Sequence, residues 1–416
     1  MTRRQVLGAA AAGAVGAVLG GIAGPLIVPP LLGTGSAPEG SSNVYPFLGP
    51  HQAGIATPVQ DHLHFAAFDM ADGATRADVE TLLRDWSYAA FRMTQGLAVS
   101  ATGAVDGDPQ VPPDDTGEAL DLPVSGLTVT IGLGAGLFEK GGVDRFGLGD
   151  RRPPALERLP PFVGDALKTD WSHGDLCLQV CADDPQVAVH AVRNLARIAF
   201  GRAAIRWSQM GFGRTSKTTT AQQTPRNLMG FKDGTNNILA EDRAALDEFV
   251  WVADRDQPAW LAGGSYLVVR KIEMLIEAWD RVRLAEQETI FGRTKRAGAP
   301  LSGGGEFTVP DFGAHAGDAP VIDGAAHVRL AHPSNNGGTR ILRRGYNYVD
   351  GNNPYGRLDA GLLFISYQRS VEQFVALQKA LSSDLLNEYI RHVGSAVFVV
   401  PRGSSAGGFV GETLFG

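Results

Sequence analysis

The sequence predicts an α+β fold made of two ferredoxin-like modules with antiparallel sheets, of the dimeric α+β barrel type. The first half alternates apolar strand and helix patterns in the order β-α-β-β-α-β, which is the ferredoxin-like order. The second half repeats much of that order, and the Ser/Thr/Gln-rich stretch 215–224 between the halves has the composition of a linker. We therefore expect an N-terminal module over residues 44–215 and a C-terminal module over residues 216–416.

In the first half, helical spacing is clearest where Val79, Leu82, Leu83 and Trp86 recur on one face. Helices are expected at residues 77–93 and 185–200. Strands are expected at residues 62–69, 127–133, 175–181 and 205–209.

In the second half, strands are expected at residues 265–272, 361–367 and 396–401, and helices at residues 274–283 and 371–381. The helix at 371–381 corresponds to the helix at 185–200 in the first half. The turn around Asp233 opens this half, where the two halves meet. Ligand sites favour such junctions, so this turn is a candidate site.

Composition excludes some classes of function. The 416 residues are 44% hydrophobic, which is enough for a well-filled core. The formal net charge of -7 argues against non-specific binding of nucleic acid. The two cysteines, Cys177 and Cys181, lie two pleats apart on one face of a predicted strand. That separation is too large for an easy disulfide within the strand, so we expect two buried apolar residues.

The N-terminus resembles an export signal. Paired arginines at positions 3 and 4 precede an Ala/Gly-rich run, as in twin-arginine signals. A membrane helix is the alternative, but three prolines between positions 25 and 30 and the scarcity of Leu disfavour it. We expect residues 1–43 to be a signal and linker read by the twin-arginine translocase, with no stable membrane span in the mature protein. The mature protein would be extracellular, periplasmic or associated with the cell envelope.

The stretch Met229–Asn237 places an aspartate between glycines, followed by Thr235 and Asn236. Glycine lets the backbone turn tightly and approach a ligand closely. The side chains of Asp, Thr and Asn add polar groups at the turn. Taken alone, the stretch also fits an ordinary Asp-Gly surface turn.

The nine histidines do not form a spaced metal-ligand set such as His-Glu-x-x-His. A zinc or copper site is therefore disfavoured. A haem iron needs only one protein ligand, commonly a histidine, and this suits the sequence better.

Three segments in order resemble one family. Gly230–Gly234 resembles the Gly-x-x-Asp-Gly signature of dye-decolourising haem peroxidases. Ala326–Ala331 resembles their proximal-histidine segment, and Ile341–Tyr346 resembles the segment with their distal arginine. The segments 51–55 and 361–364 also resemble family blocks.

The resemblance extends from about Val44 to the C-terminus, and the paired arginines and long loops are most similar to the exported, EfeB-like branch. The family fold, two ferredoxin-like modules with haem between them, agrees with the duplication. The resemblance implies one haem b per chain, bound in the C-terminal module near the junction. It also implies that His327 is the axial iron ligand, with His315 and His332 as rivals.

The same resemblance implies that Asp233 shuttles a proton between the peroxide oxygens and that Arg343 stabilises the developing negative charge. The neighbouring Arg344 is a rival for the second role. A proximal histidine is usually held by an acceptor on its other nitrogen. Glu388 is the first candidate for that acceptor and Asp384 the second.

Other residues are expected around the haem. Phe364 would line the distal pocket, and Gly234 would let the backbone pass close by. Thr235, Asn236 and Arg293 would lie at the haem edge and its propionates, because arginine pairs well with carboxylates. The resemblance also implies that bulky substrates are oxidised through surface radicals, for which the candidates are Tyr389, Tyr346, Tyr348, Trp207 and Trp279.

The expected function is a peroxidase that uses hydrogen peroxide, through a ferryl intermediate, to oxidise dyes, phenolics, metal ions or other one-electron donors. The competing hypothesis is an envelope protein that handles haem or its iron, with incidental peroxidase activity, because a fold does not fix a function. The sequence leaves a homo-oligomer open.

Overall fold

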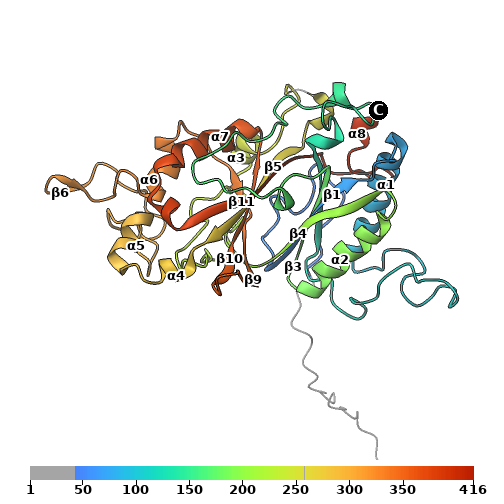
Figure 1. Ribbon diagram of the computed structural model, residues 1–416, viewed down its shortest axis with the longest axis horizontal. Helices are drawn as coiled ribbons and strands as arrows, with labels where there is room; N and C mark the ends of the chain where they lie inside the picture. Colours follow the sequence, from blue (N-terminus) through green and yellow to red (C-terminus); the bar gives the residue numbers. More distant parts are fainter. Residues whose placement is uncertain (1–42, 257) are drawn as a thin grey trace, which may run out of the picture. The chain divides into compact units, whose positions relative to one another are not determined.

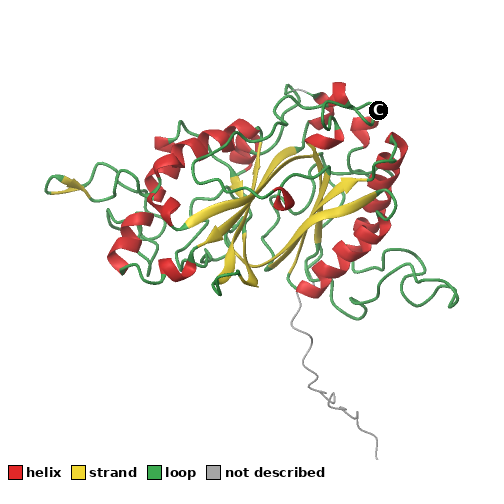
Figure 2. Ribbon diagram, in the orientation of Figure 1, coloured by secondary structure: helices red, strands yellow, loops and turns green. Residues whose placement is uncertain are grey.

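The computed structural model describes residues 43–256 and 258–416, and it confirms the predicted α+β class (Figures 1 and 2). The predicted export signal lies outside the described residues. Nine strands form one sheet in the order β5-β11-β2-β3-β1-β4-β9-β10-β8, and every pairing in it is antiparallel. Because β5 also pairs with β10, the sheet closes into a barrel.

The strands have the following bounds: β1 His62–Met70, β2 Thr128–Gly134, β3 Leu176–Ala182, β4 Ala203–Arg214, β5 Ser265–Met274, β8 Leu342–Arg343, β9 Tyr346–Asn352, β10 Leu358–Gln368 and β11 Ile390–Val400. A separate hairpin pairs β6 (His315–Ala316) with β7 (Ala319–Pro320). Within the barrel, the first half contributes the order β4-β1-β3-β2 and the second half the order β11-β5-β10-β9. The two halves therefore have the same strand order, and they join where β11 meets β2 and where β4 meets β9.

Two long helices, α1 (Arg76–Met93) and α2 (Pro185–Ile198), cover the outer face of the first half (Figure 1). A capping box at Thr75 begins α1, and Asp184 caps α2 just before a proline that suits the first turn. The apolar faces of the two helices pack on the sheet and on each other, and the indole nitrogen of the fully buried Trp86 donates to the Leu195 carbonyl at 2.8 Å.

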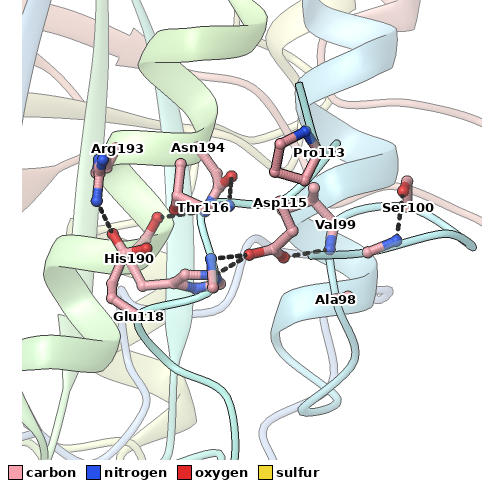
Figure 3. A network of polar contacts seen from close by, with 12 residues as sticks. Ala98, Val99, Ser100, Pro113, Asp115, Thr116, Glu118, His190, Arg193 and Asn194 are labelled. Atoms are coloured by element: carbon pink, nitrogen blue, oxygen red, sulfur yellow. Dashed lines mark hydrogen bonds and ion pairs between the residues drawn. The ribbon is translucent and has the colours of Figure 1, made fainter. Parts of the chain in front are cut away.

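A long loop between α1 and β2 is tied to α2 by buried polar contacts (Figure 3). The carboxylate of Asp115 accepts hydrogen bonds from the backbone of Val99 at 3.0 Å and of Gly117 at 2.8 Å, and it contacts His190 Nε2 at 2.8 Å. Asn194 donates to the Thr116 hydroxyl at 2.7 Å. Polar groups thus replace the apolar contacts that the glycine- and proline-rich loop lacks.

The helices of the second half are short: α3 Arg243–Phe249, α4 Ile276–Trp279, α5 Leu284–Phe291, α6 His327–Ala331, α7 Val371–Ala380 and α8 Glu412–Phe415. Single 3₁₀ turns are η1 Ala135–Leu137, η2 Gly149–Arg151, η3 Thr169–Trp171, η4 Ala259–Leu261, η5 Pro333–Asn335, η6 Leu381–Ser383 and η7 Leu385–Glu388. The helix expected at 274–283 is wrong in extent, because β5 continues to Met274 and only one α-turn follows. Strand β9, which the sequence pattern did not predict, completes the β-α-β-β-α-β order of this half.

The barrel interior is filled by apolar side chains, among them Phe65, Trp207, Val269 and Phe398. Both cysteines are free and buried, as predicted, and Cys177 and Cys181 belong to this interior cluster. Among the described residues, no helix has the length and apolar character to cross a membrane.

Candidate active site

A cavity of about 380 Å³ lies in the second half, between the outer face of the sheet and the short helices α6 and α7. The strands β5, β10 and β11 supply apolar side chains to one wall, and α7 with the following turns supplies more. These apolar lining residues are Ile272, Met274, Leu362, Phe364, Ile390, Phe374, Leu377, Leu381 and Leu386. Such an apolar wall suits a large apolar ligand, and the polar side chains that line the rest of the cavity can bind the polar groups of that ligand.

His327 is the first residue of α6 and lines this cavity. Its Nδ1 lies 2.5 Å from Oδ2 of the buried Asp384, whose other oxygen accepts the Leu386 N–H at 2.9 Å. Burial lowers the pKa of His327, but the charge of Asp384 and its hydrogen bond outweigh that effect, and the pKa is raised above its ordinary value.

The expectation that Glu388 holds His327 is wrong. Glu388 is exposed at the end of η7, and Asp384 occupies the position next to the imidazole. Asp384 also caps that 3₁₀ turn, so the turn holds its carboxylate in place independently of the contact with the histidine.

The guanidinium of Arg343 and the carboxylate of Asp233 line the same cavity and form an ion pair, with Nη1 of Arg343 donating to Oδ1 of Asp233 at 2.6 Å. Arg344 lies elsewhere. It is fully buried and donates to the carbonyls of Thr57 and Pro58. Adjacent residues in extended backbone point to opposite sides, so only Arg343 reaches the cavity.

Two asparagines that the sequence did not mark as site residues hold this ion pair. Nδ2 of Asn227 donates to Oδ2 of Asp233 at 3.3 Å. The amide of Asn237 bonds both main-chain groups of Arg343, accepting its N–H and donating to its carbonyl, each at 2.8 Å. Asn237 belongs to the Asp233 stretch, but nothing in the sequence pairs it with a residue 106 positions away.

The glycines of the Asp233 turn have backbone conformations that side chains rarely adopt, with φ of 83° at Gly230 and 87° at Gly234. Gly234 lines the cavity, yet its closest neighbour is main chain, because an added Cβ would lie 2.7 Å from Cα of Ser216. This glycine therefore allows close packing of the turn against the linker segment.

The remaining predicted residues line the same cavity: Thr235, Asn236, Arg293 and Phe364. Arg293 is half-buried, and its Nη1 donates to the carbonyls of Gly298 at 2.6 Å and Glu306 at 2.9 Å. Of the two rival histidines, His332 lines the cavity and contacts the Ser334 hydroxyl at 2.8 Å. His315 is exposed on the separate β6–β7 hairpin and is not part of the lining.

A row of aromatic rings connects the surface with this site. The ring of Tyr389, which is half-buried, lies 5.2 Å from that of Trp279. Trp279 lies 5.8 Å from Phe291, and Phe291 lies 6.0 Å from His327. The other radical candidates, Tyr346, Tyr348 and Trp207, are buried and do not line the cavity.

Within the described residues, no group of three or more His, Cys, Asp and Glu side chains could hold a metal ion. The cavity instead offers one carboxylate-supported histidine, an aspartate–arginine pair and apolar walls. In a barrel of two ferredoxin-like halves, this combination supplies the groups that a haem site with a single histidine ligand uses.

Comparison with known proteins identifies the family, and the chain belongs to the Dyp-type peroxidases. The model of the Dyp-type peroxidase N-terminal region matches residues 52–213, and that of the C-terminal region matches residues 224–405. The resemblance inferred from Asp233, His327 and Arg343 is therefore confirmed at the level of the family, and with it the assignment as a haem peroxidase.

Relatives with known names cover nearly the whole chain. The deferrochelatase of Escherichia coli strain K12 is 37% identical over 385 residues, which span 91% of this chain and 89% of the relative. The solved structure of ferric DtpA from Streptomyces lividans has 40% identity and a TM-score of 0.81, covering 90% of this chain and 98% of that one. A DyP-type peroxidase from Cellulomonas bogoriensis has 42% identity and a TM-score of 0.79 with the same coverage.

Proposed function

We propose that this protein binds one haem b per chain in the cavity of its second half and uses hydrogen peroxide to oxidise dyes, phenolics or other one-electron donors. The observation that carries the proposal is the meeting of two pairs, His327 with Asp384 and Asp233 with Arg343, on one apolar cavity. These four residues come from separate parts of the chain. Membership of the Dyp-type peroxidase family supports the same function.

The residues of the cavity fit a haem. The apolar wall of Ile272, Leu362 and Phe364 suits the faces and edges of a porphyrin. Arg293 at the edge of the cavity supplies a cation for a propionate. Haem, when bound, supplies the iron on which peroxide is reduced.

His327 would be the iron ligand, and Asp384 would orient it. The hydrogen bond to Asp384 keeps a proton on Nδ1, so the lone pair of Nε2 is left for a metal. The carboxylate also makes the imidazole a stronger electron donor. Asp384 is in turn fixed by the Leu386 N–H, so the ligand is held by two successive contacts.

Asp233 would move the proton that peroxide cleavage requires. Reduction of hydrogen peroxide to water needs a proton taken from one oxygen and delivered to the departing oxygen. The carboxylate of Asp233 is held through Oδ1 by Arg343 and through Oδ2 by Asn227, so both oxygens have a fixed position in the cavity. The guanidinium of Arg343 would stabilise the negative charge that develops on the departing oxygen.

Bulky donors would be oxidised at the surface rather than in the cavity. Tyr389 and Trp279 are our candidates for this route, because their rings are in contact and continue through Phe291 to His327. The supporting observation is this continuous row of aromatic rings from Tyr389 to His327.

The proposal is tested by stopped-flow mixing of the haem-loaded protein with peroxide. Asp233→Ala should retain haem but react with peroxide about 10²–10⁴-fold more slowly, the range for loss of a positioned proton-transfer group. Arg343→Ala should slow the reaction by about 10²–10³-fold. Asp247→Ala, an exposed aspartate on α3, is the control and should react at the wild-type rate. Wild-type rates in both cavity variants would rule out these roles.

A second candidate function is the handling of haem or its iron in the cell envelope. The observation in its favour is the 37% identity to proteins named deferrochelatase. The products after incubation with haem separate the two candidates. Metal-free porphyrin would support iron release, whereas oxidised dye without metal-free porphyrin would support the peroxidase.

We also propose export by the twin-arginine translocase, to the periplasm, the envelope or the medium. The paired arginines at positions 3 and 4 are the supporting feature. Replacing both by lysine should keep the protein in the cytoplasmic fraction, and unchanged export of that variant would contradict the proposal.

A further inference from the structure

One segment at the cavity has few contacts of its own. Residues Gly303–Pro310, named the strap here, contribute five consecutive residues to the cavity lining, from Glu306 to Pro310. Two of them are large apolar side chains that stay exposed, Phe307 at 65% and Val309 at 74%. Exposed apolar groups beside an apolar cavity are stabilised when a ligand covers them.

The strap begins with three consecutive glycines. Gly303 and Gly304 have φ of 106° and 91°, which other residues rarely adopt. An added Cβ would have no neighbour within 4 Å at Gly303 or Gly305, and at Gly304 its nearest neighbour would be Thr308 Oγ1 of the strap itself, at 2.4 Å. A chain with such conformational freedom and open surroundings is a suitable hinge.

Glu306 makes the hydrogen bonds that hold the strap in place, and the Lys217 ammonium also lies 4.5 Å from the centre of the Phe307 ring. The carboxylate of Glu306, with the side chain 11% exposed, forms an ion pair with Lys232 and accepts a hydrogen bond from Thr235 Oγ1 at 3.3 Å. Its carbonyl accepts from Arg293 Nη1 at 2.9 Å. Beyond the adjoining Pro300, the hydrogen bonds from the strap to the rest of the described chain all pass through Glu306.

The residues that hold Glu306 belong to the site itself. Lys232 and Thr235 flank the turn that carries Asp233 and Gly234, and Arg293 is our candidate partner for a propionate. Burial raises the pKa of Glu306, but the hydrogen bond and charge of Lys232 help to hold it below its ordinary value, so the residue stays a carboxylate at neutral pH. Glu306 therefore carries the negative charge that the ion pair needs at neutral pH.

We propose that the strap is a gate through which a porphyrin enters and leaves the cavity, and that the Glu306–Lys232 ion pair is its latch. This inference rests on the proposed haem site. When the latch breaks, the glycines at 303–305 let the strap swing away, which exposes the cavity edge at Arg293. The latch sets the rate of exchange rather than the chemistry at the iron.

The test measures transfer of haem from the loaded protein to an excess of apomyoglobin, followed by absorbance. Glu306→Gln keeps the size of the side chain but removes its charge, and it should speed transfer by about tenfold or more, the factor that a charge-assisted contact is typically worth. Lys232→Met should give a similar acceleration. The control is Glu80→Gln, which removes an exposed carboxylate paired with Arg84 on α1, and it should transfer haem at the wild-type rate.

The double variant Glu306→Gln/Lys232→Met distinguishes loss of one shared ion pair from two independent destabilising effects on the strap. A shared latch predicts that the double variant transfers haem no faster than either single variant. Unchanged or slower transfer in the single variants, or accelerations that multiply in the double variant, would overturn the strap proposal. A wild-type protein that takes up no haem would instead overturn the proposed function, so the two failures are distinguishable.

Discussion

Each half of the protein contains a histidine next to a buried aspartate, and the two pairs differ in what surrounds them. In the first half, Nε2 of His190 contacts Asp115 at 2.8 Å (Figure 3). In the second half, Nδ1 of His327 contacts Asp384 at 2.5 Å. Both aspartates are buried, so burial and a carboxylate partner do not by themselves mark a functional histidine.

The difference lies in the rest of each histidine's surroundings. Asp115 also accepts two backbone N–H groups of its loop, so the pair with His190 closes a structural contact. His327 directs one nitrogen to Asp384 and lines a cavity with the rest of its ring. The pair that lines a cavity, His327 with Asp384, is therefore the candidate for ligand binding, whereas the pair of His190 with Asp115 is not part of that lining.

Packing explains why, in the part of the chain that the structure describes, the cavity between the sheet and its covering helices lies in the second half. On the first half, the 18 residues of α1 and the 14 residues of α2 cover the sheet with side chains such as Trp86 and Leu195. On the second half, α7 has 10 residues and α6 has 5, and the cavity lies between them and the sheet. The same strand order is thus covered by closely packed helices in the first half and by short helices that leave a cavity in the second half.

The largest effect on the free energy of unfolding is expected in the first half. Asp115→Ala should lower the free energy of unfolding by about 3–5 kcal/mol, because it leaves the His190 ring and two backbone N–H groups without their acceptor, at about 1–3 kcal/mol each. Haem absorbance should not change, because neither Asp115 nor His190 lines the cavity. Chemical denaturation monitored by circular dichroism measures the effect, and an unchanged midpoint would contradict the structural role of the pair.

The same contact predicts a dependence on pH. Burial raises the pKa of Asp115, but hydrogen bonds from His190 and from the backbone of Gly117 and Val99 lower it by more than that. The pKa therefore lies below its ordinary value of 3.8. The stabilisation is therefore present above pH 3.8 and is lost as the pH falls through the lower folded value. The difference in stability between wild type and Asp115→Ala should shrink below that pH, and a constant difference would contradict this cause.

A smaller effect is expected from Asp384→Asn in the second half. The amide can still accept the hydrogen bond of His327, but it lacks the negative charge that would make His327, our proposed iron ligand, a stronger electron donor. Loss of such a partner typically costs 10–100-fold, or about 1.4–2.7 kcal/mol, in metal affinity or activity. Haem titration and steady-state peroxidase assays measure both quantities, and wild-type values would show that Asp384 does not support the ligand.

Most of the fold could be predicted from the sequence, because the local spacing of apolar residues indicates most of the strands and helices. The strand at 62–69 and the helices at 77–93 and 185–200 match β1, α1 and α2 closely, since their apolar residues follow regular periods. Strand β9 lacked that signal, because its last four residues are exposed and include an Asp-Gly pair. The helix expected at 274–283 failed because the strand β5 continued into its first residue.

Contacts across long separations could not be predicted in this way. The choice between Asp384 and Glu388 depends on how the η6 and η7 turns pack against α6, 57 residues away from the carboxylate. The choice between Arg343 and Arg344 depends on which side of a two-residue strand faces the cavity. Similarity to a family gave Asp233, His327 and Arg343 together, and the structure then added Asn227 and Asn237.

The smallest effect is expected from Glu388→Gln. This residue is exposed and is not part of the cavity lining, so haem affinity and peroxidase turnover should stay within about twofold of wild type, as for most surface substitutions. A loss as large as that of Asp384→Asn would show that the protein in solution uses the other carboxylate.

The absorption spectrum of the haem-loaded protein tests the contrast between the two histidines most directly. His327→Ala should lose or strongly shift the Soret band, because this variant lacks the proposed protein ligand of the iron. His190→Ala should keep the wild-type band and show only reduced stability. A wild-type Soret band in His327→Ala, or its loss in His190→Ala, would contradict the assignment of the haem site to the second half.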